Sequence, residues 1–314
     1  MFDLKKHKVR SKLDMNLLIV TGLQKSGTSL LNRMLMGQSC VSNPFLPEGK
    51  FFWGDDPPFS PKASPCGELY QKHLGKRGHY LGESDFRASD ERLLMSRVEH
   101  AKIKTPILMN KNPYNSVRIK WIKKIFPDAK VVSMFRNPHA NVFSLLKKYI
   151  DHDNRGIGPE NGWWGVKPKN WQEILSDNKI EQLAKQWQSV NQQILNDIND
   201  VDLLIEYSDL CSNPNTYLQK IFSLWEDNYV FKEMPVCQNF DNEYKTGSRL
   251  LSKNREYQKN KELDLSMIQE NKGELPPFDS KDINIIQNIC SDVWIKLQIT
   301  KKNESCNLSI PYPE

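Results

Sequence analysis

Eight residues between a strand-like run and a helix-like run constrain this chain most. Residues 22–29 read Gly-Leu-Gln-Lys-Ser-Gly-Thr-Ser, and we call them the anion loop. The apolar run 17–20 precedes them, and an apolar helical pattern follows at Leu30, Leu31, Met34 and Leu35. In a strand, loop and helix of this kind, backbone N–H groups and the positive end of the helix dipole converge on one point. The loop therefore predicts a site for a phosphate or a sulfate.

The lysine of the anion loop stands at an unusual place. A Walker A loop, G-x4-G-K-[ST], carries its lysine directly after the second glycine. Here Thr28 follows Gly27, and Lys25 comes two residues before that glycine. The anion site is kept, but ATP chemistry is disfavoured. A P-loop kinase or another nucleoside triphosphate-binding protein stays the alternative.

Length and hydropathy limit the class of protein. A chain of 314 residues can bury roughly three-quarters of its unfolded surface. No run approaches the ~18 apolar residues of a membrane span, and the basic tail at residues 1–14 lacks an apolar core. We expect one domain over residues 15–314, without a membrane partner.

The cysteines and the basic residues narrow the class further. The six cysteines show no C-x-x-C pair and no zinc-type spacing, which predicts reduced thiols, no metal and a cytoplasmic location. Residues 92–150 hold thirteen Lys or Arg against two acids. Because this block lacks a nucleic-acid-binding signature, we expect a small polyanionic ligand and no nucleic acid partner.

Strand-like and helix-like runs alternate along the chain. The strand-like runs are 17–20, 107–109, 131–135 and 203–205, and later helix-like runs are 115–126, 179–198, 215–225 and 283–297. This order predicts an α/β fold with a central parallel sheet flanked by helices. Two irregular inserts, rich in Pro at about 43–90 and in Gly at about 151–170, are expected to form lids or binding loops.

A second motif follows the run 131–135. Arg136, Asn137 and Pro138 come directly after it, and Ser144 lies about two helical turns farther on. Open α/β sheets bind ligands beyond the carboxyl ends of their strands, and the planar guanidinium group matches phosphate oxygens. Taken alone, this motif fits an ordinary strand-to-helix junction equally well.

Together, the two motifs resemble those of the sulfotransferase family, which uses 3′-phosphoadenosine 5′-phosphosulfate (PAPS) as its donor. The likeness covers about residues 15–227, including Lys111-Asn112-Pro113, residues 126–130 and 207–214. It is closer to the bacterial, carbohydrate and tyrosylprotein branches than to the phenol and steroid branch. The resemblance implies a P-loop-like nucleotide-binding sulfotransferase fold, 3′-phosphoadenosine 5′-phosphate (PAP) as product, and no metal.

The resemblance also implies roles for single residues. The 5′-phosphosulfate would be held by Lys25, Ser26, Gly27, Thr28 and Ser29, with Lys25 near the bridging oxygen. Arg136 and Ser144 would hold the 3′-phosphate, with residues 249–261 as a further candidate. Trp187 and Tyr207 would frame the adenine, although each fits the core equally well. Ala140 departs from the aspartate that many members carry there.

The transfer needs a base, because the acceptor loses a proton as its bond to sulfur forms. Glu48 is our leading candidate, by analogy with tyrosylprotein-type relatives, and Lys111 is expected to contact the transferring sulfate or the acceptor. Alternatives for the base are Glu83, Asp85, His79, His139 and His152. Lys25 would stabilise charge on the leaving phosphate, by analogy with phosphoryl transfer.

Acidic residues in the first insert, among them Asp55, Asp56 and Asp90, predict an acidic rim beside the acceptor. Such a rim favours a cationic acceptor over a sulfated glycan. The resemblance to bacterial sulfotransferases, which often tailor natural products, implies sulfation of a hydroxyl or of an amine or carbamate nitrogen on a small molecule, preferably a polar or cationic natural product. A glycan or a peptide tyrosine stays an alternative acceptor. The choice between O- and N-sulfation, the oligomeric state, including a homodimer, and the pathway stay open.

Overall fold

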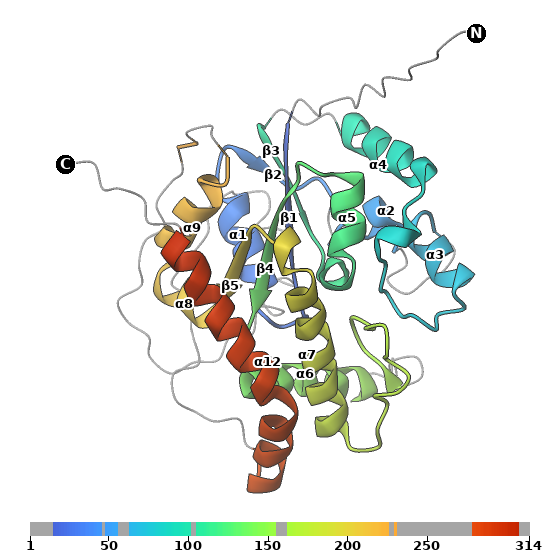
Figure 1. The fold of residues 1–314 in the computed structure, drawn as a ribbon, viewed down its shortest axis with the longest axis vertical. Coiled ribbons are helices and arrows are strands. Elements are labelled where there is room, and N and C mark those ends of the chain that lie inside the picture. Colours follow the sequence, from blue (N-terminus) through green and yellow to red (C-terminus); the bar gives the residue numbers. More distant parts are fainter. Residues whose placement is uncertain are drawn as a thin grey trace, which may run out of the picture.

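The chain folds around a five-stranded sheet. The computed structural model describes residues 15–45, 48–55, 63–101, 105–154, 162–225, 229–230 and 278–307. The strand order is β2-β3-β1-β4-β5, and every pairing is parallel (Figure 1). The strands are β1 Asn16–Gly22, β2 Val41–Ser42, β3 Ile107–Lys111, β4 Lys130–Phe135 and β5 Leu203–Glu206. The predicted α/β class with a parallel sheet is confirmed.

The central strand β1 sends alternate side chains into two apolar layers. Leu17 and Ile19 join the cluster that contains α5 (Ile119–Ile125), α7 (Lys179–Asn196) and α12 (Ser280–Asn307). Leu18 and Val20 join the cluster that contains α1 (Thr28–Met36) and α9 (Pro214–Phe222). This alternation follows from the twofold period of a strand covered on both faces.

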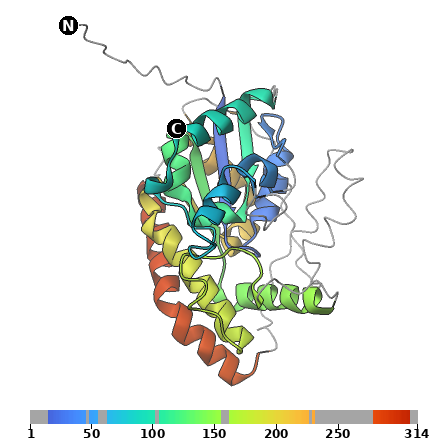
Figure 2. The same cartoon turned by 90° about the vertical axis from the view of Figure 1, so that its right-hand side faces the viewer.

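Helices also occupy parts of the predicted inserts. The first insert contains α2 Lys50–Trp53, α3 Cys66–Lys72, the short 3-10 helix η1 Glu83–Asp85 and the start of α4 Ala88–His100. The helix α6, Pro138–Asn154, enters the second insert. Figure 2 shows α7 and α12 lying side by side, which their contacts confirm. Both inserts are therefore less irregular than the sequence predicted.

Three features correct or complete the sequence interpretation. The 3-10 helix η2, Pro113–Val117, precedes α5, so the predicted helix at 115–126 is divided. Trp163 is buried against Trp171 and Ile174, so it packs under its loop. Cys40, Cys66, Cys211 and Cys290 form no disulfide within the described ranges. In the part of the chain that the structure describes, no helix has the length and apolar character needed to cross a membrane.

Candidate functional site

The candidate site lies where the strands end. The anion loop follows β1, Lys111 ends β3, Arg136 follows β4, and Tyr207 begins α8 (Tyr207–Ser212) directly after β5. In the sheet register, Val20 of β1 pairs with Lys111, and Gly22 pairs with Met134 of β4. The parallel strand order therefore gathers the predicted groups at one edge of the sheet, as expected for a ligand site in an open α/β sheet.

The anion loop has the backbone of an anion cradle. Gly27 is the N-cap of α1 with a φ of 102°, and no side chain caps the first N–H groups of this helix. A Cβ at Gly27 would lie 2.3 Å from Cδ2 of Tyr207, so glycine is required both by its φ and by the adjacent ring. Uncapped N–H groups and the helix dipole favour an anion at this position. The loop therefore fits a phosphate or a sulfate.

The other residues of the anion loop differ in backbone conformation and in solvent exposure. Lys25 has a φ of 68°, a left-handed conformation that is uncommon for a residue with a side chain. Ser26 is fully buried, and its Oγ has no hydrogen-bond partner within the described ranges. Thr28 is also buried, whereas Ser29 is partly exposed. A buried hydroxyl without a partner beside uncapped amides is consistent with a ligand that supplies oxygen atoms.

Arg136 connects the anion loop with Tyr207. Its Nη1 donates to the carbonyl oxygen of Lys25 at 3.3 Å, and its guanidinium carbon lies 4.5 Å from the centre of the Tyr207 ring. The Nε1–H of Trp187 donates to the carbonyl oxygen of Arg136 at 3.1 Å. The Trp187 ring has no exposed surface, so in this structure it holds the Arg136 turn. Its predicted contact with adenine stays a prediction.

The start of α6 is held by side chains near the anion loop. Asn137 Oδ1 accepts from the N–H groups of His139 and Ala140, at 3.0 and 3.4 Å. Asn141 Nδ2 donates to the carbonyl oxygen of Gln24 at 2.9 Å, which ties α6 to the loop. Asn137 thus supplies a cap where Ala140 cannot. Ser144 lies partly exposed on the same helix, and the predicted segment 249–261 lies outside the described residues.

Glu48 and Lys111, predicted separately, are an ion pair. Lys111 Nζ donates to Glu48 Oε1 at 2.6 Å. The Lys111 side chain is 7% exposed and that of Glu48 is 36% exposed. Burial opposes ionisation of Glu48, but the charge and hydrogen bond of Lys111, helped by Lys50, lower the pKa of Glu48 overall. Glu48 is therefore ionised at neutral pH and can accept a proton.

Asn110 and Trp53, which the sequence interpretation did not identify, hold the turn after Glu48. Glu48 and Gly49 are both left-handed, with φ of 58° and 65°. A Cβ at Gly49 would lie 2.4 Å from Nδ2 of Asn110, and Oδ1 of Asn110 accepts from Trp53 Nε1 at 2.8 Å. Asn110 precedes Lys111 on β3, so one strand end positions both partners of the ion pair. A polar residue ending a buried strand was the signal available in the sequence.

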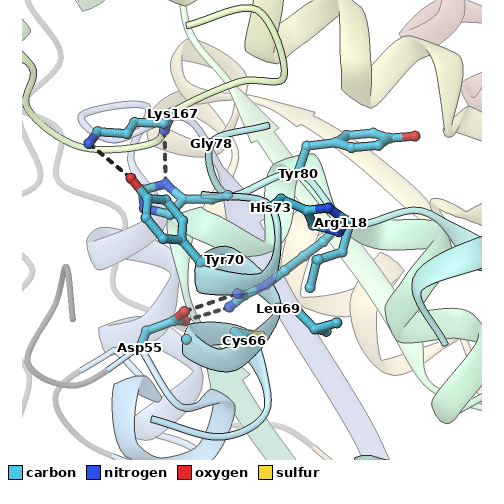
Figure 3. Close-up of a pocket in the computed structure, with 12 residues that line it drawn as sticks. Asp55, Cys66, Leu69, Tyr70, His73, Gly78, Tyr80, Arg118 and Lys167 are labelled. Carbon is cyan, nitrogen blue, oxygen red and sulfur yellow. Dashed lines mark hydrogen bonds and ion pairs between the residues drawn. The ribbon is translucent and has the colours of Figure 1, made fainter. Parts of the chain in front are cut away.

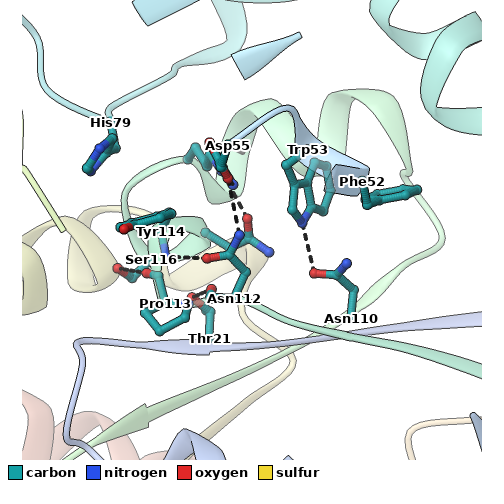
Figure 4. A network of polar contacts seen from close by, with 12 residues as sticks. Thr21, Phe52, Trp53, Asp55, His79, Asn110, Asn112, Pro113, Tyr114 and Ser116 are labelled. Carbon is teal, nitrogen blue, oxygen red and sulfur yellow. Dashed lines mark hydrogen bonds and ion pairs between the residues drawn. The ribbon is translucent and has the colours of Figure 1, made fainter. Parts of the chain in front are cut away.

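A buried polar network fixes the next part of the insert (Figure 4). Arg118 donates to both oxygens of Asp55, at 3.1 and 2.6 Å, and Asn112 Nδ2 donates to Asp55 Oδ2 at 3.2 Å. Asn115 Oδ1 accepts from Arg118 Nε at 2.9 Å. Asp55 and Arg118 are almost inaccessible to solvent. The network therefore attaches the insert to the segment directly after Lys111.

Three acids of the predicted acidic rim are compensated by arginines. Asp55 pairs with Arg118, Asp85 with Arg77 at 2.8 Å, and Asp90 with Arg87 at 2.7 Å. Arg77 and Arg87 lie close in sequence to the acids that they pair with, whereas Arg118 reaches Asp55 from the start of α5. Asp56 lies outside the described residues. These three pairs weaken the argument for a cationic acceptor, while Glu83 of the same segment is exposed.

The alternative bases have other surroundings. Burial raises the pKa of Asp85, but Arg77, the Gly82 N–H and His73 lower it overall. Burial, followed by Lys167 and Arg118, holds the pKa of His79 well below its usual value. Glu83 is exposed, burial lowers the pKa of His139, and the side chain of His152 lies outside the described residues. Glu48 is the candidate whose partner, Lys111, ends a strand beside β1.

The chain is similar to several known proteins. A family model described as "Sulfotransferase family" matches residues 18–226. A sulfotransferase from Alicyclobacillus acidocaldarius is 14% identical, with a TM-score of 0.46, over 91% of this chain and 95% of that one. The sulfotransferase domain of a Synechococcus olefin synthase is 16% identical, with a TM-score of 0.43, over 87% of this chain and 93% of that one. A sulfotransferase from Mycobacterium avium is 13% identical, with a TM-score of 0.46, over 91% of this chain and 77% of that one. No curated protein sequence matches the chain.

Proposed function

Because the chain belongs to the sulfotransferase family, we propose that it transfers a sulfuryl group from PAPS to a hydroxyl or an amine of a small molecule. The observation that carries this proposal is the meeting of the anion loop with Arg136, which contacts both Lys25 and Tyr207. A helix N-terminus alone would fit many anions. An arginine directly beside it provides a second anion site, which suits a nucleotide with phosphate at two positions.

The donor would be held by the anion loop and by α6. The N–H groups of Thr28 and Ser29 at the start of α1 suit the 5′-phosphosulfate, and the Lys25 ammonium group would neutralise charge on the leaving phosphate oxygen. Arg136 and Ser144 would contact the 3′-phosphate. Tyr207, which packs against Gly27 and Arg136, would place its ring beside the adenine of the donor.

Glu48 would take the proton of the acceptor. As the acceptor oxygen or nitrogen forms its bond to sulfur, the bond from sulfur to the 5′-phosphate oxygen breaks, and PAP leaves. The displaced acceptor proton moves to the Glu48 carboxylate. The protein therefore acts mainly by positioning the two substrates and by stabilising charge.

Lys111 would serve both Glu48 and the sulfuryl group. Its 2.6 Å contact keeps Glu48 ionised, but it also weakens Glu48 as a base. If Lys111 turns toward the sulfuryl oxygens when the donor binds, Glu48 becomes more basic at the moment when a base is needed. This exchange would couple donor binding to proton removal.

The acceptor class is proposed more broadly than the sequence suggested. A small polar molecule stays our proposal, and a glycan or peptide tyrosine stays the alternative. Since Asp55, Asp85 and Asp90 are each paired with an arginine, these acids give little support to a cationic acceptor, which stays one of the polar acceptors that we propose.

Ligand-dependent thermal unfolding tests the donor. PAP should raise the unfolding temperature at concentrations well above its Kd, because a ligand that binds only the folded state stabilises it. ATP with Mg²⁺ should give a smaller rise. A larger rise with ATP and Mg²⁺ than with PAP would favour a P-loop kinase instead.

Turnover tests the reaction. Incubation with PAPS and a panel of phenols, alcohols and amines should add one sulfate to some acceptor, detected by mass spectrometry. Lys25→Ala should lower kcat by about 10²- to 10³-fold. Glu48→Gln should lower kcat while the Kd of PAP stays the same. Full activity of Glu48→Gln would move the base to another residue, and unchanged turnover of Lys25→Ala would contradict the role of the anion loop.

A further inference from the structure

Buried charges hold each side of the candidate site. On the acceptor side they are Asp55 and Arg118 (Figure 3). On the nucleotide side they are Lys301 of α12, Glu206 and Asp209, which we call the Lys301 bridge. The bridge joins a helix beyond the family match to the edge of the sheet where the nucleotide is proposed to bind.

The Lys301 bridge encloses Tyr207 in the sequence. Glu206 ends β5, Tyr207 is the first residue of α8, and Asp209 lies in the first turn of that helix. Lys301 pairs with the acids on both sides of Tyr207, so α12 lies beside the end of β5 and the start of α8 (Figure 1). The bridge therefore spans the turn that places the Tyr207 ring.

The bridge is shielded from solvent. The side chains of Lys301 and Glu206 are 14% and 12% exposed. Lys301 Nζ donates to Asp209 Oδ2 at 2.7 Å and also to Glu206 Oε2, and Gln298, one turn earlier on α12, donates to the same Glu206 oxygen at 2.9 Å. Burial lowers the pKa of Lys301, but its hydrogen bonds to Asp209 and Glu206 raise this pKa overall, so the lysine is charged at neutral pH.

Lys301 supplies a charge that the neighbouring hydroxyl groups lack. The Tyr217 hydroxyl donates to Asp209 Oδ2 at 3.2 Å, and Ser208 Oγ donates to Glu206 Oε1 at 2.7 Å. Because one ammonium group bonds to both carboxylates, these carboxylates lie close together and would repel each other without it. Lys301 therefore stabilises the turn from β5 into α8 in one arrangement.

Tyr207 connects this turn with the two proposed anion sites. A Cβ at Gly27 would lie 2.3 Å from Cδ2 of Tyr207, and the guanidinium carbon of Arg136 lies 4.5 Å from the centre of the Tyr207 ring. The Gly27 carbonyl oxygen accepts from the N–H groups of Leu30 and Leu31, at 2.9 and 3.2 Å. A shift of the Tyr207 ring would therefore disturb both the first turn of α1 and Arg136.

The same helix also packs behind Arg136. Trp294 lies about two helical turns before Lys301 on α12. Its ring centre is 5.7 Å from that of Phe135, which precedes Arg136, and 6.5 Å from that of Trp187, whose Nε1–H donates to the Arg136 carbonyl oxygen. Both protein groups of the proposed nucleotide side are thus supported by α12.

We propose that Lys301 is a positioning residue for the donor nucleotide. The Lys301 bridge holds the Tyr207 ring against the anion loop and beside Arg136, so that the two anion sites keep one fixed separation. Lys301 acts through Tyr207 and not by touching the reacting atoms. This inference rests on the proposed function, because it assigns a residue that prepares the same site for the donor.

The ion pair of Lys130 offers a matched control. Lys130 pairs with Asp202 at 3.1 Å, and their side chains are 30% and 18% exposed. Lys130 begins β4 and Asp202 precedes β5, so this pair lies at the ends of the two strands opposite to Arg136 and Tyr207. Loss of either lysine should lower stability, whereas loss of Lys301 should also disturb Tyr207.

Calorimetric titration with PAP tests the proposal. Lys301→Met should weaken PAP binding by about three- to tenfold, the range for a moderate coupling between contacting residues. Lys130→Met should bind PAP with the affinity of the unmodified protein. Unchanged affinity in Lys301→Met, or an equal loss in both variants, would overturn the positioning role.

A double-mutant cycle tests whether Lys301 acts through Tyr207. Tyr207→Ala should weaken PAP binding by itself. Adding Lys301→Met to Tyr207→Ala should weaken it further by less than about twofold, because residues that act through one another are not additive. Losses that multiply in the double variant would show that Lys301 acts independently of Tyr207 and would overturn the proposal.

Asp209→Asn gives a second test if Lys301→Met does not fold. Asparagine has the shape of aspartate, and the Asp209 side chain is 36% exposed, so this change is milder. Lys301 keeps Glu206 as a partner, and PAP binding should weaken by about two- to fivefold in the Asp209→Asn variant. This loss should also disappear in the Tyr207→Ala background. Unchanged PAP affinity in Asp209→Asn would contradict the proposal.

Amide hydrogen exchange of the ligand-free protein separates this proposal from the reaction. Residues 22–31 should exchange faster in Lys301→Met than in Lys130→Met, because the contact of Tyr207 with Gly27 is loosened. If PAP binds and sulfation occurs, but Lys301→Met binds PAP as Lys130→Met does, the reaction stands and the positioning role falls. If neither PAP binding nor sulfation is found but the exchange difference appears, the Lys301 bridge still holds the anion loop and the reaction falls.

Discussion

Two regions of the molecule meet at the carboxyl edge of the sheet and are held in different ways. The nucleotide side, formed by the anion loop, Arg136 and Tyr207, follows directly from neighbouring strands. The acceptor side, formed by the first insert, is attached through side chains, above all Glu48 to Lys111 and Asp55 to Arg118. Strand order places the first region, whereas ion pairs place the second.

This difference separates stability from binding. On the nucleotide side, Arg136 is partly exposed, and among the described residues its guanidinium contacts the Lys25 carbonyl and the Tyr207 ring but no carboxylate. On the acceptor side, Arg118 is fully engaged by Asp55 and Asn115. Removing a charge should therefore reduce ligand affinity on the first side and fold stability on the second.

The largest expected effect is on stability. Asp55→Ala would leave the Arg118 charge buried without its partner and should lower the free energy of unfolding by about 3–5 kcal/mol. Asp85→Ala is the matched control, because its partner Arg77 has a 26% exposed side chain and can turn to water. Denaturant unfolding measures both. A loss as large in Asp85→Ala would remove the distinction between buried and accessible pairs.

The next effect is on affinity. Arg136→Ala should weaken PAP binding by about 10- to 100-fold, the range for a charge-assisted hydrogen bond. Binding of adenosine 5′-phosphosulfate, which lacks the 3′-phosphate, should change little. Arg87→Ala removes an arginine from the acceptor side and should leave PAP affinity intact. Calorimetric titration measures the affinity for both nucleotides. Equal losses of affinity for PAP and for adenosine 5′-phosphosulfate would contradict the role of Arg136.

A smaller effect is expected at Trp187. Trp187→Phe removes the N–H that bonds to the Arg136 carbonyl and should weaken PAP binding by about two- to tenfold. Trp171→Phe removes the same type of bond from the acceptor side, where Trp171 Nε1 donates to Gly75 at 2.8 Å. The Trp171→Phe variant should bind PAP with the same affinity as the unmodified protein. Similar losses in both variants would point to general loosening instead of positioning.

The smallest expected effect is a shift in the pH dependence of kcat/KM. The charge and hydrogen bond of Lys111 lower the pKa of Glu48, so Glu48 stays ionised until the pH falls below the usual range for glutamate, and the acidic limb of kcat/KM should lie there. Lys111→Met removes the main charge that lowers this pKa, so the limb should move to higher pH. Lys50→Met should move it in the same direction by less. A limb that stays in place in Lys111→Met would show that Glu48 is not the base.

Sequence periodicity predicted most of the framework, because long apolar runs indicate buried strands and helices directly. It missed β2, whose two residues are too few to show alternation. It also treated the whole first insert as irregular, although no proline occurs between Pro65 and Pro106. Leu94 and Val98, four residues apart, provide the buried face of α4.

The sequence predicted the nucleotide side of the site better than the acceptor side, for a related reason. Lys25 and Arg136 follow adjacent parallel strands, so their proximity follows from topology. The contact of Asp55 with Arg118 joins residues 63 positions apart, one of them in an insert. No periodic pattern encodes such a pair, and the charge balance of the insert could not be predicted without it.

The position of α12 has a practical consequence for protein engineering. The family match ends at residue 226, but α12 lies beyond it and packs Trp294 against Trp187 and Phe135. Its Lys301 also forms ion pairs with Glu206 and Asp209, on either side of Tyr207. A fragment cloned to the limits of the family match would keep Lys25, Arg136, Ser144 and Tyr207 but lose the helix that packs behind them, so expression or chimera work should extend through residue 307.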